Sequence, residues 1–215
     1  MKVALIASIP EREQMLERTV RSLRNQVNEI RVTLNDYDHI PKYLNEKECI
    51  ILDNSMGDAG KFYFADHFRG YIFICDDDLI YPANYVSYMI AGVKRHNCVV
   101  TLHGRDYIGK ITGFQQGFIG YPCLGDVSKD VQVNVGGDGV MCYHTDLIQF
   151  SYSDFKSKNM SQLWVAKKCK EQDMRIMVLA HRGDYLKYQM PTWTIWDEAN
   201  KEGFREQTAL LKTFL

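Results

Sequence analysis

The chain has 215 residues, of which 46% are hydrophobic and 25% are charged, and its formal net charge is −1. These values are typical of one globular domain, and the near-neutral charge argues against a nucleic-acid or membrane-surface binder. No apolar run approaches the roughly 20 residues that cross a bilayer. The six cysteines form no CxxC pair, so we expect reduced thiols and a cytoplasmic protein.

Apolar periodicity predicts alternating strands and helices in the first half of the chain. The expected strands are 2–7, 29–34, 49–52, 71–75 and 98–102, and the expected helices are 11–26, 61–68 and 82–96. This alternation predicts an α/β fold in which helices cover both faces of a largely parallel sheet.

The second half has a different pattern. Residues 107–121 are rich in glycine and aromatic side chains, which predicts a hairpin or a mobile loop. Beyond it we expect strands at 131–135, 140–143 and 175–179 and helices at 161–171 and 197–211. The apolar final residues predict that the chain stops inside a longer polypeptide.

Three consecutive carboxylates, Asp76, Asp77 and Asp78, follow the apolar run 71–75 directly. Acids at one strand end repel one another unless a cation lies between them, and ligands bind at these ends in open α/β sheets. Mg²⁺ and Mn²⁺ take oxygen ligands and usually hold substrate phosphates as well. The cluster therefore predicts a metal and phosphate site, and the alternative is a polar turn that leads to Pro82.

Polar groups also follow the first three predicted strands. They are Ser8-Ile9-Pro10-Glu11-Arg12, Asn35-Asp36 and Gly57-Asp58-Ala59-Gly60-Lys61. Because parallel strands end at one edge of a sheet, we expect these groups and the aspartates to converge on one ligand. The turn after the first strand lacks the GxGxxG motif of dinucleotide-binding proteins. The two glycines of 57–61 are too closely spaced for a P-loop. Arg12 and Lys61 are therefore either ligand contacts or solvated surface charges.

These motifs in this order resemble the nucleotide-binding half of GT-A fold, family-2-like glycosyltransferases, in which Asp76-Asp77-Asp78 stands as the DxD motif. Residues 136–141 resemble the acceptor-side glycine turn, and 160–164 resemble the helix after it. The resemblance implies a GT-A (Rossmann-like) fold with a mixed, mostly parallel central sheet. It implies a single domain, 1–215, with a nucleotide-binding half of about 1–102 and an acceptor half of about 103–215.

The resemblance implies metal-dependent transfer of a sugar from a nucleoside-diphosphate sugar, with UDP favoured, to a glycan or glycoprotein. The chain also resembles the N-terminal domain of chlorella-virus glycosyltransferases that decorate a capsid protein, which implies the host cytoplasm. In the family pattern Asp78 and Asp76 bind Mn²⁺ or Mg²⁺, and His181 completes the metal shell, although a lone histidine is commonly structural. The implied nucleotide-sugar contacts are Ala7, Ser8, Pro10, Arg12, Asn35, Asp36, Asp58, Lys61, Asp76, Asp77 and Gly137.

Catalysis of sugar transfer requires stabilisation of the leaving diphosphate and of an oxocarbenium-like anomeric carbon. Asp138, between two glycines, is the candidate carboxylate for the anomeric carbon or the acceptor hydroxyl, and a hairpin-turn role is the alternative. Many inverting relatives carry an acid where this chain has Gln162. The base is therefore Asp138 or another acid such as Asp154, or the reaction retains configuration, which we favour.

Aromatic side chains of the second half suit an acceptor site because sugar rings stack on flat apolar faces, although ordinary packing also accounts for each. They are Tyr107, Phe114, Phe118, Tyr121, Trp193 and Trp196. Two other functions use the same acids. One is a nucleotidyltransferase or phosphodiesterase, and the other is a non-catalytic module that binds nucleotide sugars.

Overall fold

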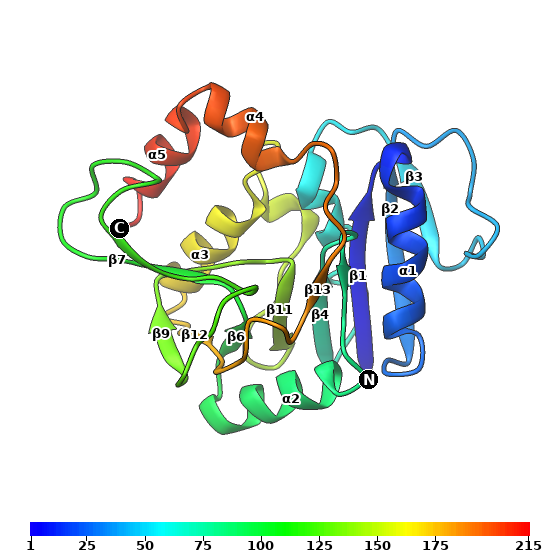
Figure 1. The fold of residues 1–215 in the computed structure, drawn as a ribbon, viewed down its shortest axis with the longest axis horizontal. Coiled ribbons are helices and arrows are strands. Elements are labelled where there is room, and N and C mark those ends of the chain that lie inside the picture. Colours follow the sequence, from blue (N-terminus) through cyan, green and yellow to red (C-terminus); the bar gives the residue numbers. More distant parts are fainter.

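The computed structural model describes residues 1–215, and an eight-stranded sheet runs through its centre (Figure 1). In spatial order the strands are β3 (Cys49–Leu52), β2 (Glu29–Asn35), β1 (Lys2–Ser8), β4 (Tyr71–Cys75), β11 (Val140–His144), β6 (Val99–Thr101), β12 (Ile176–Val178) and β9 (Val131–Val133). The parallel pairs are β1 with β2, β1 with β4, β2 with β3, and β6 with β12. The antiparallel pairs are β11 with β4, β11 with β6, and β9 with β12. The predicted mixed, mostly parallel α/β class is confirmed.

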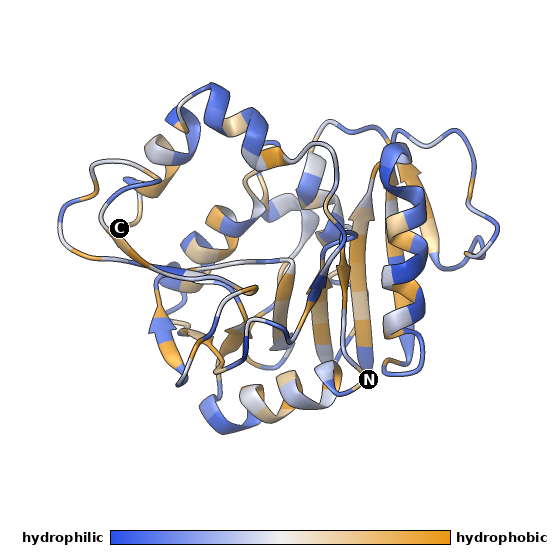
Figure 2. Cartoon of the chain, viewed as in Figure 1, coloured by the Kyte–Doolittle hydropathy of each residue, from blue (hydrophilic) through white to orange (hydrophobic).

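The central strands are apolar throughout because both faces of the sheet are covered. In β4, Ile72 and Ile74 belong to one buried cluster, whereas Phe73 and Cys75 belong to the other. Successive side chains of a strand point to opposite faces, so a strand between two cores needs a continuous apolar run. Figure 2 shows these apolar strands at the centre and hydrophilic residues on the outer surfaces of the helices.

Helices form a layer on each face of the sheet (Figure 1). α1 (Glu13–Leu23) and α2 (Tyr85–His96) contribute to one core, and α3 (Ser161–Glu171), α4 (Ile195–Lys201) and α5 (Arg205–Leu211) contribute to the other. In α1, Leu16, Val20 and Leu23 are buried at helical spacing, as expected for a helix with one apolar face. No helix combines the length and the apolar character that a membrane span requires.

Two small sheets extend the main one. The predicted hairpin is confirmed, since β7 (Gly104–Tyr107) pairs antiparallel with β8 (Phe118–Tyr121), and β10 (Val135–Gly136) pairs with β7. β13 (Lys187–Tyr188) pairs with β5 (Leu79–Ile80), directly after the aspartate cluster. This second pairing returns the chain to the carboxyl edge of the main sheet.

Two predicted helices are wrong in form. The helix expected at 61–68 is a 3-10 turn, η2 (Gly57–Phe62), since Thr33 Oγ1 and Asn35 Nδ2 donate to the carbonyls of Gly60 and Gly57. The closing helix expected at 197–211 is divided into α4 and α5, because Gly203 and Phe204 adopt positive φ angles of 67° and 53°. A left-handed pair of residues ends a helix, and a second helix then starts.

The remaining short elements are two 3-10 turns. η1 (Pro10–Arg12) forms the start of the helix that was expected at 11–26, and η3 (Tyr152–Asp154) precedes the segment that enters α3. All six cysteines are free thiols.

Candidate functional site

The ends of β1, β2 and β4 meet beside η2, as expected for parallel strands that share one edge. They line one cavity, here called the strand-end cavity. Its lining includes the predicted residues Ala7, Ser8, Arg12, Asn35, Asp58, Lys61, Asp76 and Asp77. The structure therefore brings together all four polar groups that the sequence placed after the strands.

A second cavity adjoins the first and is here called the carboxylate cavity. It shares Arg12, Asp58, Lys61 and Asp76 with the strand-end cavity and adds Asp78, Asp138 and Gln162. The predicted catalytic residues and the predicted metal ligands Asp76 and Asp78 thus face one space. Pro10 and Asp36 line a third, outer hollow, which shares Ile9, Arg12, Asn54 and Trp193 with the strand-end cavity.

The three aspartates have different environments because neighbouring residues of an extended chain point to opposite sides. Asp77 is 4% exposed and accepts hydrogen bonds from Ser8 Oγ at 2.6 Å and from Arg12 Nη1 at 2.9 Å. Asp76 Oδ1 accepts from Lys61 Nζ at 2.6 Å. Asp77 is therefore fixed by protein contacts, while Asp76 and Asp78 retain carboxylate oxygens at the carboxylate cavity.

Gly139 leaves the space that Asp76 occupies. A Cβ atom at Gly139 would lie 1.7 Å from Asp76 Oδ2, and the Asp76 amide donates to the Gly139 carbonyl at 3.1 Å. A side chain at position 139 would therefore force the Asp76 carboxylate to move.

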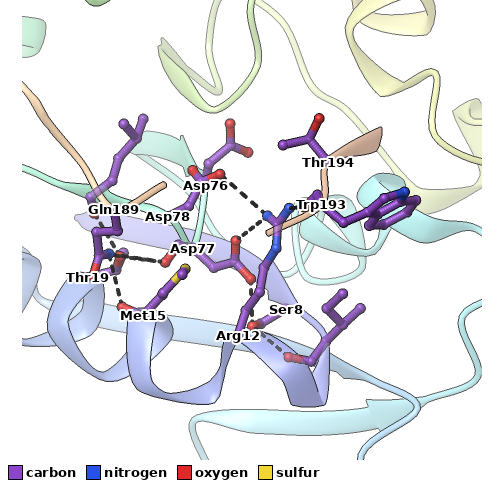
Figure 3. Close-up of polar contacts among 12 residues, drawn as sticks. Ser8, Arg12, Met15, Thr19, Asp76, Asp77, Asp78, Gln189, Trp193 and Thr194 are labelled. Carbon is purple, nitrogen blue, oxygen red and sulfur yellow. Dashed lines mark hydrogen bonds and ion pairs between the residues drawn. The ribbon is translucent and has the colours of Figure 1, made fainter. Parts of the chain in front are cut away.

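Arg12 connects the first turn to the aspartate cluster (Figure 3). Its Nη1 lies 2.9 Å from Asp77 and 3.4 Å from Asp78, and its Nη2 donates to the Trp193 carbonyl at 2.8 Å. Burial lowers the pKa of Arg12, but the charge of Asp77 and its hydrogen bond raise it further, so the net shift is upward. The alternative of a solvated helix charge is wrong for Arg12.

Lys61 is also paired. It is 5% exposed, and its Nζ lies 2.6 Å from Asp76 and 3.4 Å from Asp138. Burial lowers its pKa, but Asp138, Asp76 and Asp58 together raise it above the ordinary value. The alternative of a solvated lysine in a glycine-rich turn is wrong.

Ser161, at the start of α3, connects the half-buried Asp58 with the buried Asp138. Its hydroxyl contacts both Asp58 and Asp138. One hydroxyl carries one proton, so it donates to one carboxylate and needs a donor from the other. Burial and the charge of Asp138 raise the pKa of Asp58 to about 7. A protonated Asp58 that donates to Ser161, which donates to Asp138, satisfies all three groups.

Asp138 lies in the turn between β10 and β11, but its side chain is buried rather than solvated as in an ordinary hairpin turn. Gly137 positions this turn: its amide donates to the His103 carbonyl at 2.7 Å, and a Cβ there would lie 2.7 Å from His103 Cβ. Gly137 lines neither of the two cavities, so it supports Asp138 rather than facing a ligand there.

Like charges are crowded at the carboxylate cavity. Burial, followed by repulsion from Asp76 and Asp77, raises the pKa of Asp78 to about 7. The donors are carboxylate oxygens, which suit Mg²⁺ or Mn²⁺. No group of three or more histidine, cysteine, aspartate or glutamate side chains is arranged to hold a metal. An ion would thus take two carboxylates, with its other ligands from water or substrate.

His181 does not join these aspartates in a metal-binding group. Its Nδ1 lies 2.7 Å from the Leu179 carbonyl and its Nε2 lies 3.3 Å from the Pro122 carbonyl. Its backbone forms a bridge with Val127. The predicted place of His181 in a metal shell therefore has no support in this geometry, because both ring nitrogens face backbone carbonyls.

The aromatic residues predicted for an acceptor are divided between the site and the core. Phe114 and Trp196 line the carboxylate cavity, together with Phe204. Trp193 lines the strand-end cavity. Tyr107 is buried, and its hydroxyl donates to the Phe114 carbonyl at 2.6 Å, so Tyr107 is a packing residue.

Several site residues were not expected from the sequence. They are Asn54, Lys158, Asn159, Ser161, Ile195 and Glu198. The segment before α4 runs across the carboxyl edge of the sheet because β13 pairs with β5 and Gln189 Nε2 donates to Met15 and Thr19 (Figures 1 and 3). A two-residue strand has no periodicity by which it could be recognised.

No family model matches this chain, and no curated protein matches it significantly. Among solved structures, residues 1–349 of S. aureus TarS in complex with UDP-GlcNAc are similar, with a TM-score of 0.55 and 13% identity over 93% of this chain and 61% of the TarS chain. A second structure of TarS 1–349 has a TM-score of 0.54 and 14% identity over 85% of this chain and 59% of the TarS chain. The chain thus spans about three fifths of TarS 1–349. At this identity the likeness supports the fold class alone and gives no support to a viral capsid link.

Proposed function

We propose that this chain is a metal-dependent glycosyltransferase domain. It transfers a sugar from a nucleoside-diphosphate sugar, with UDP favoured, to a glycan or glycoprotein acceptor. The main support is that Asp76 and Asp78 present carboxylate oxygens to one space with Asp138, next to a cavity formed by the strand ends. A similar fold is present in TarS, whose structure contains UDP-GlcNAc.

The charges at the site support a divalent cation. The aspartate carboxylates outnumber the cationic groups paired with them, which are Arg12 and Lys61. A diphosphate would add further negative charge, so its binding needs a counter-charge at Asp76 and Asp78. Mn²⁺ or Mg²⁺ held there would act as a Lewis acid toward the leaving diphosphate.

The protein's own residues preorganise the site around that charge. Lys61 holds Asp76 and Asp138, and Arg12 holds Asp77 and Asp78, so the carboxylates keep their positions before a substrate arrives. Fixed charges stabilise a transition state more effectively because they need not reorganise during the reaction. The segment at Trp193 is tied to the same Arg12.

Asp138 is the proposed catalytic carboxylate. Ser161 and Lys61 fix it at the carboxylate cavity, where it would stabilise positive charge at the anomeric carbon or accept the acceptor's proton. Gln162 lines the same cavity, and its neutral amide orients a substrate hydroxyl but cannot act as a base. We favour retention of configuration, in which Asp138 stabilises the anomeric carbon and no base is needed at the position of Gln162. The aromatic wall of Phe114, Trp196 and Phe204 would contact the acceptor.

A product assay tests the activity. The protein is incubated with Mn²⁺, a panel of UDP- and GDP-sugars and mixed glycan acceptors, and nucleotide release and glycan mass are measured. We expect one donor to give a product one sugar heavier, with activity reduced at least about 100-fold in Asp138→Asn. Asp184→Asn, at an exposed site, is the control. Release of pyrophosphate or nucleoside monophosphate would instead indicate phosphoryl chemistry. The cytoplasmic location and capsid glycosylation stay predictions from the sequence.

A further inference from the structure

Three cationic side chains line the strand-end cavity, and two of them are already paired. Arg12 binds Asp77 and Asp78, and Lys61 binds Asp76 and Asp138. Lys158 is exposed and forms no ion pair with any acid. It is therefore the one cation of this cavity whose charge remains free for a ligand.

The loop that carries Lys158 is held firmly against the cavity wall. Asn159 Oδ1 accepts from the Asp58 amide at 3.2 Å, and Asn159 Nδ2 donates to Glu198 at 3.3 Å. On the other side, Trp164 Nε1 donates to Ser157 Oγ at 2.8 Å. The backbone at Lys158 thus has a fixed neighbour on each side, although the side chain itself has no polar partner.

The stem of Lys158 packs over the floor of the cavity at Gly57. A Cβ atom at Gly57 would lie 3.1 Å from Lys158 Cγ and 1.8 Å from Asn159 Oδ1, and Gly57 also has a φ of 57°. The Gly57 carbonyl accepts from Asn35, another lining residue. A glycine at this position lets the lysine stem cross close to the backbone, and Lys158 is one of the residues that line the cavity.

We propose that Lys158 binds a phosphate group of the nucleotide. The inference rests on the proposed function and adds a binding residue that comes from a different part of the chain than the aspartates. An ammonium group has three donors, one full charge and no acceptor, so it gains most from an anion. The phosphates are the anionic groups of a nucleoside diphosphate, whereas its base and ribose are neutral.

Calorimetry with two ligands tests the proposal. UDP and uridine are titrated in Mn²⁺ into the wild type, Lys158→Ala and Lys156→Ala. Lys156 is the matched control, since it is an exposed lysine of the same loop that contacts the Ser153 carbonyl and lies outside the strand-end cavity. We expect Lys158→Ala to weaken UDP binding about fivefold, which corresponds to the loss of one solvent-exposed ionic contact, and to leave uridine binding unchanged. Lys156→Ala matches the wild type for both ligands.

The salt dependence provides a second readout. Because the lost contact is ionic, UDP binding by Lys158→Ala falls less steeply with added salt than UDP binding by the wild type. Equal UDP affinity in Lys158→Ala and wild type overturns the inference and leaves the proposed function standing. Equal weakening of UDP and uridine also overturns it, because the residue then supports the nucleoside. If the wild type binds GDP in place of UDP, the same series is run with GDP and guanosine, and if it binds neither diphosphate, the proposed function itself fails.

Discussion

The Arg12 guanidinium lies 2.9 Å from the Asp77 carboxylate and joins the turn after β1 to the aspartate cluster after β4. Asp77 is the middle one of the three consecutive aspartates, and its oxygens accept hydrogen bonds from Arg12 and Ser8. Asp77 is therefore held in place by the protein itself, whereas Asp76 and Asp78 line the carboxylate cavity and can contact a ligand.

Asp77→Asn should lower the stability of the protein by about 2 kcal/mol, because it leaves the part-buried Arg12 with only the more distant Asp78. Urea denaturation at pH 7.5 measures the change. Asp184→Asn, whose partner Arg182 is exposed, should alter stability by less than about 0.5 kcal/mol. An equally small effect at Asp77 would show that the Arg12 pair does not support the fold.

Gly139→Ala should displace Asp76, since the added methyl group would overlap its carboxylate. We expect Mn²⁺-dependent nucleotide affinity to fall by at least about tenfold, which corresponds to about 1.4 kcal/mol. Gly113→Ala is the control, because its Cβ would meet only ordinary contacts at 3.5 Å or more. Unchanged binding in Gly139→Ala would mean that the position of Asp76 does not matter for the ligand.

Asp58→Asn should flatten the dependence of stability on pH. The pKa of Asp58 is raised to about 7 in the folded protein, so the folded state binds a proton that the unfolded state releases near pH 4. Stability from this group is therefore present at low pH and is lost as pH rises from about 4 to about 7. Asparagine reproduces the protonated acid, because it donates to Ser161 at every pH.

Chemical denaturation from pH 4 to pH 8 measures this effect. At pH 8 Asp58→Asn should be more stable than the wild type by roughly 1–2 kcal/mol, and near pH 4 the two should agree. Asp173→Asn, at an exposed position outside both cavities, is the control and should follow the wild type. A parallel decline of Asp58→Asn and wild type with pH would show that Asp58 is ionised throughout.

Trp196→Ala should weaken acceptor use and leave donor binding intact, because Trp196 lines the carboxylate cavity but not the strand-end cavity. We expect the acceptor KM to rise about fivefold or more with UDP affinity unchanged, as for the loss of one stacked ring. Initial rates at varied acceptor concentration measure the change. An unchanged KM for the acceptor would remove Trp196 from the acceptor site.

The sequence predicts the sheet and its ligand edge because these depend on local patterns. A strand buried on both faces must be a continuous apolar run, as at Tyr71–Cys75, and polar residues directly after such runs lie at one edge of the sheet. The predicted bounds of β4 are correct for this reason, and those of β3 and α3 also agree with the structure.

The rest of the site depends on tertiary contacts that leave no periodic signal. Ser161 bridges Asp58 and Asp138 only because α3 begins beside η2, and the segment at Trp193 reaches Arg12 only through the short β5–β13 pairing. The expectation for His181 relied on its order in the chain, but side-chain orientation decides whether a histidine binds metal. Lys158 was missed because an exposed lysine looks the same in sequence whether or not it lines a cavity.

The most direct test of the account is calorimetric titration of UDP, GDP and their sugars, with and without Mn²⁺, into the wild type and Asp78→Ala. Asp184→Ala serves as the exposed control. The account predicts Mn²⁺-dependent binding of one nucleotide series by the wild type and the control, and its loss in Asp78→Ala. Absence of binding to every nucleotide sugar in the wild type would contradict the glycosyltransferase proposal.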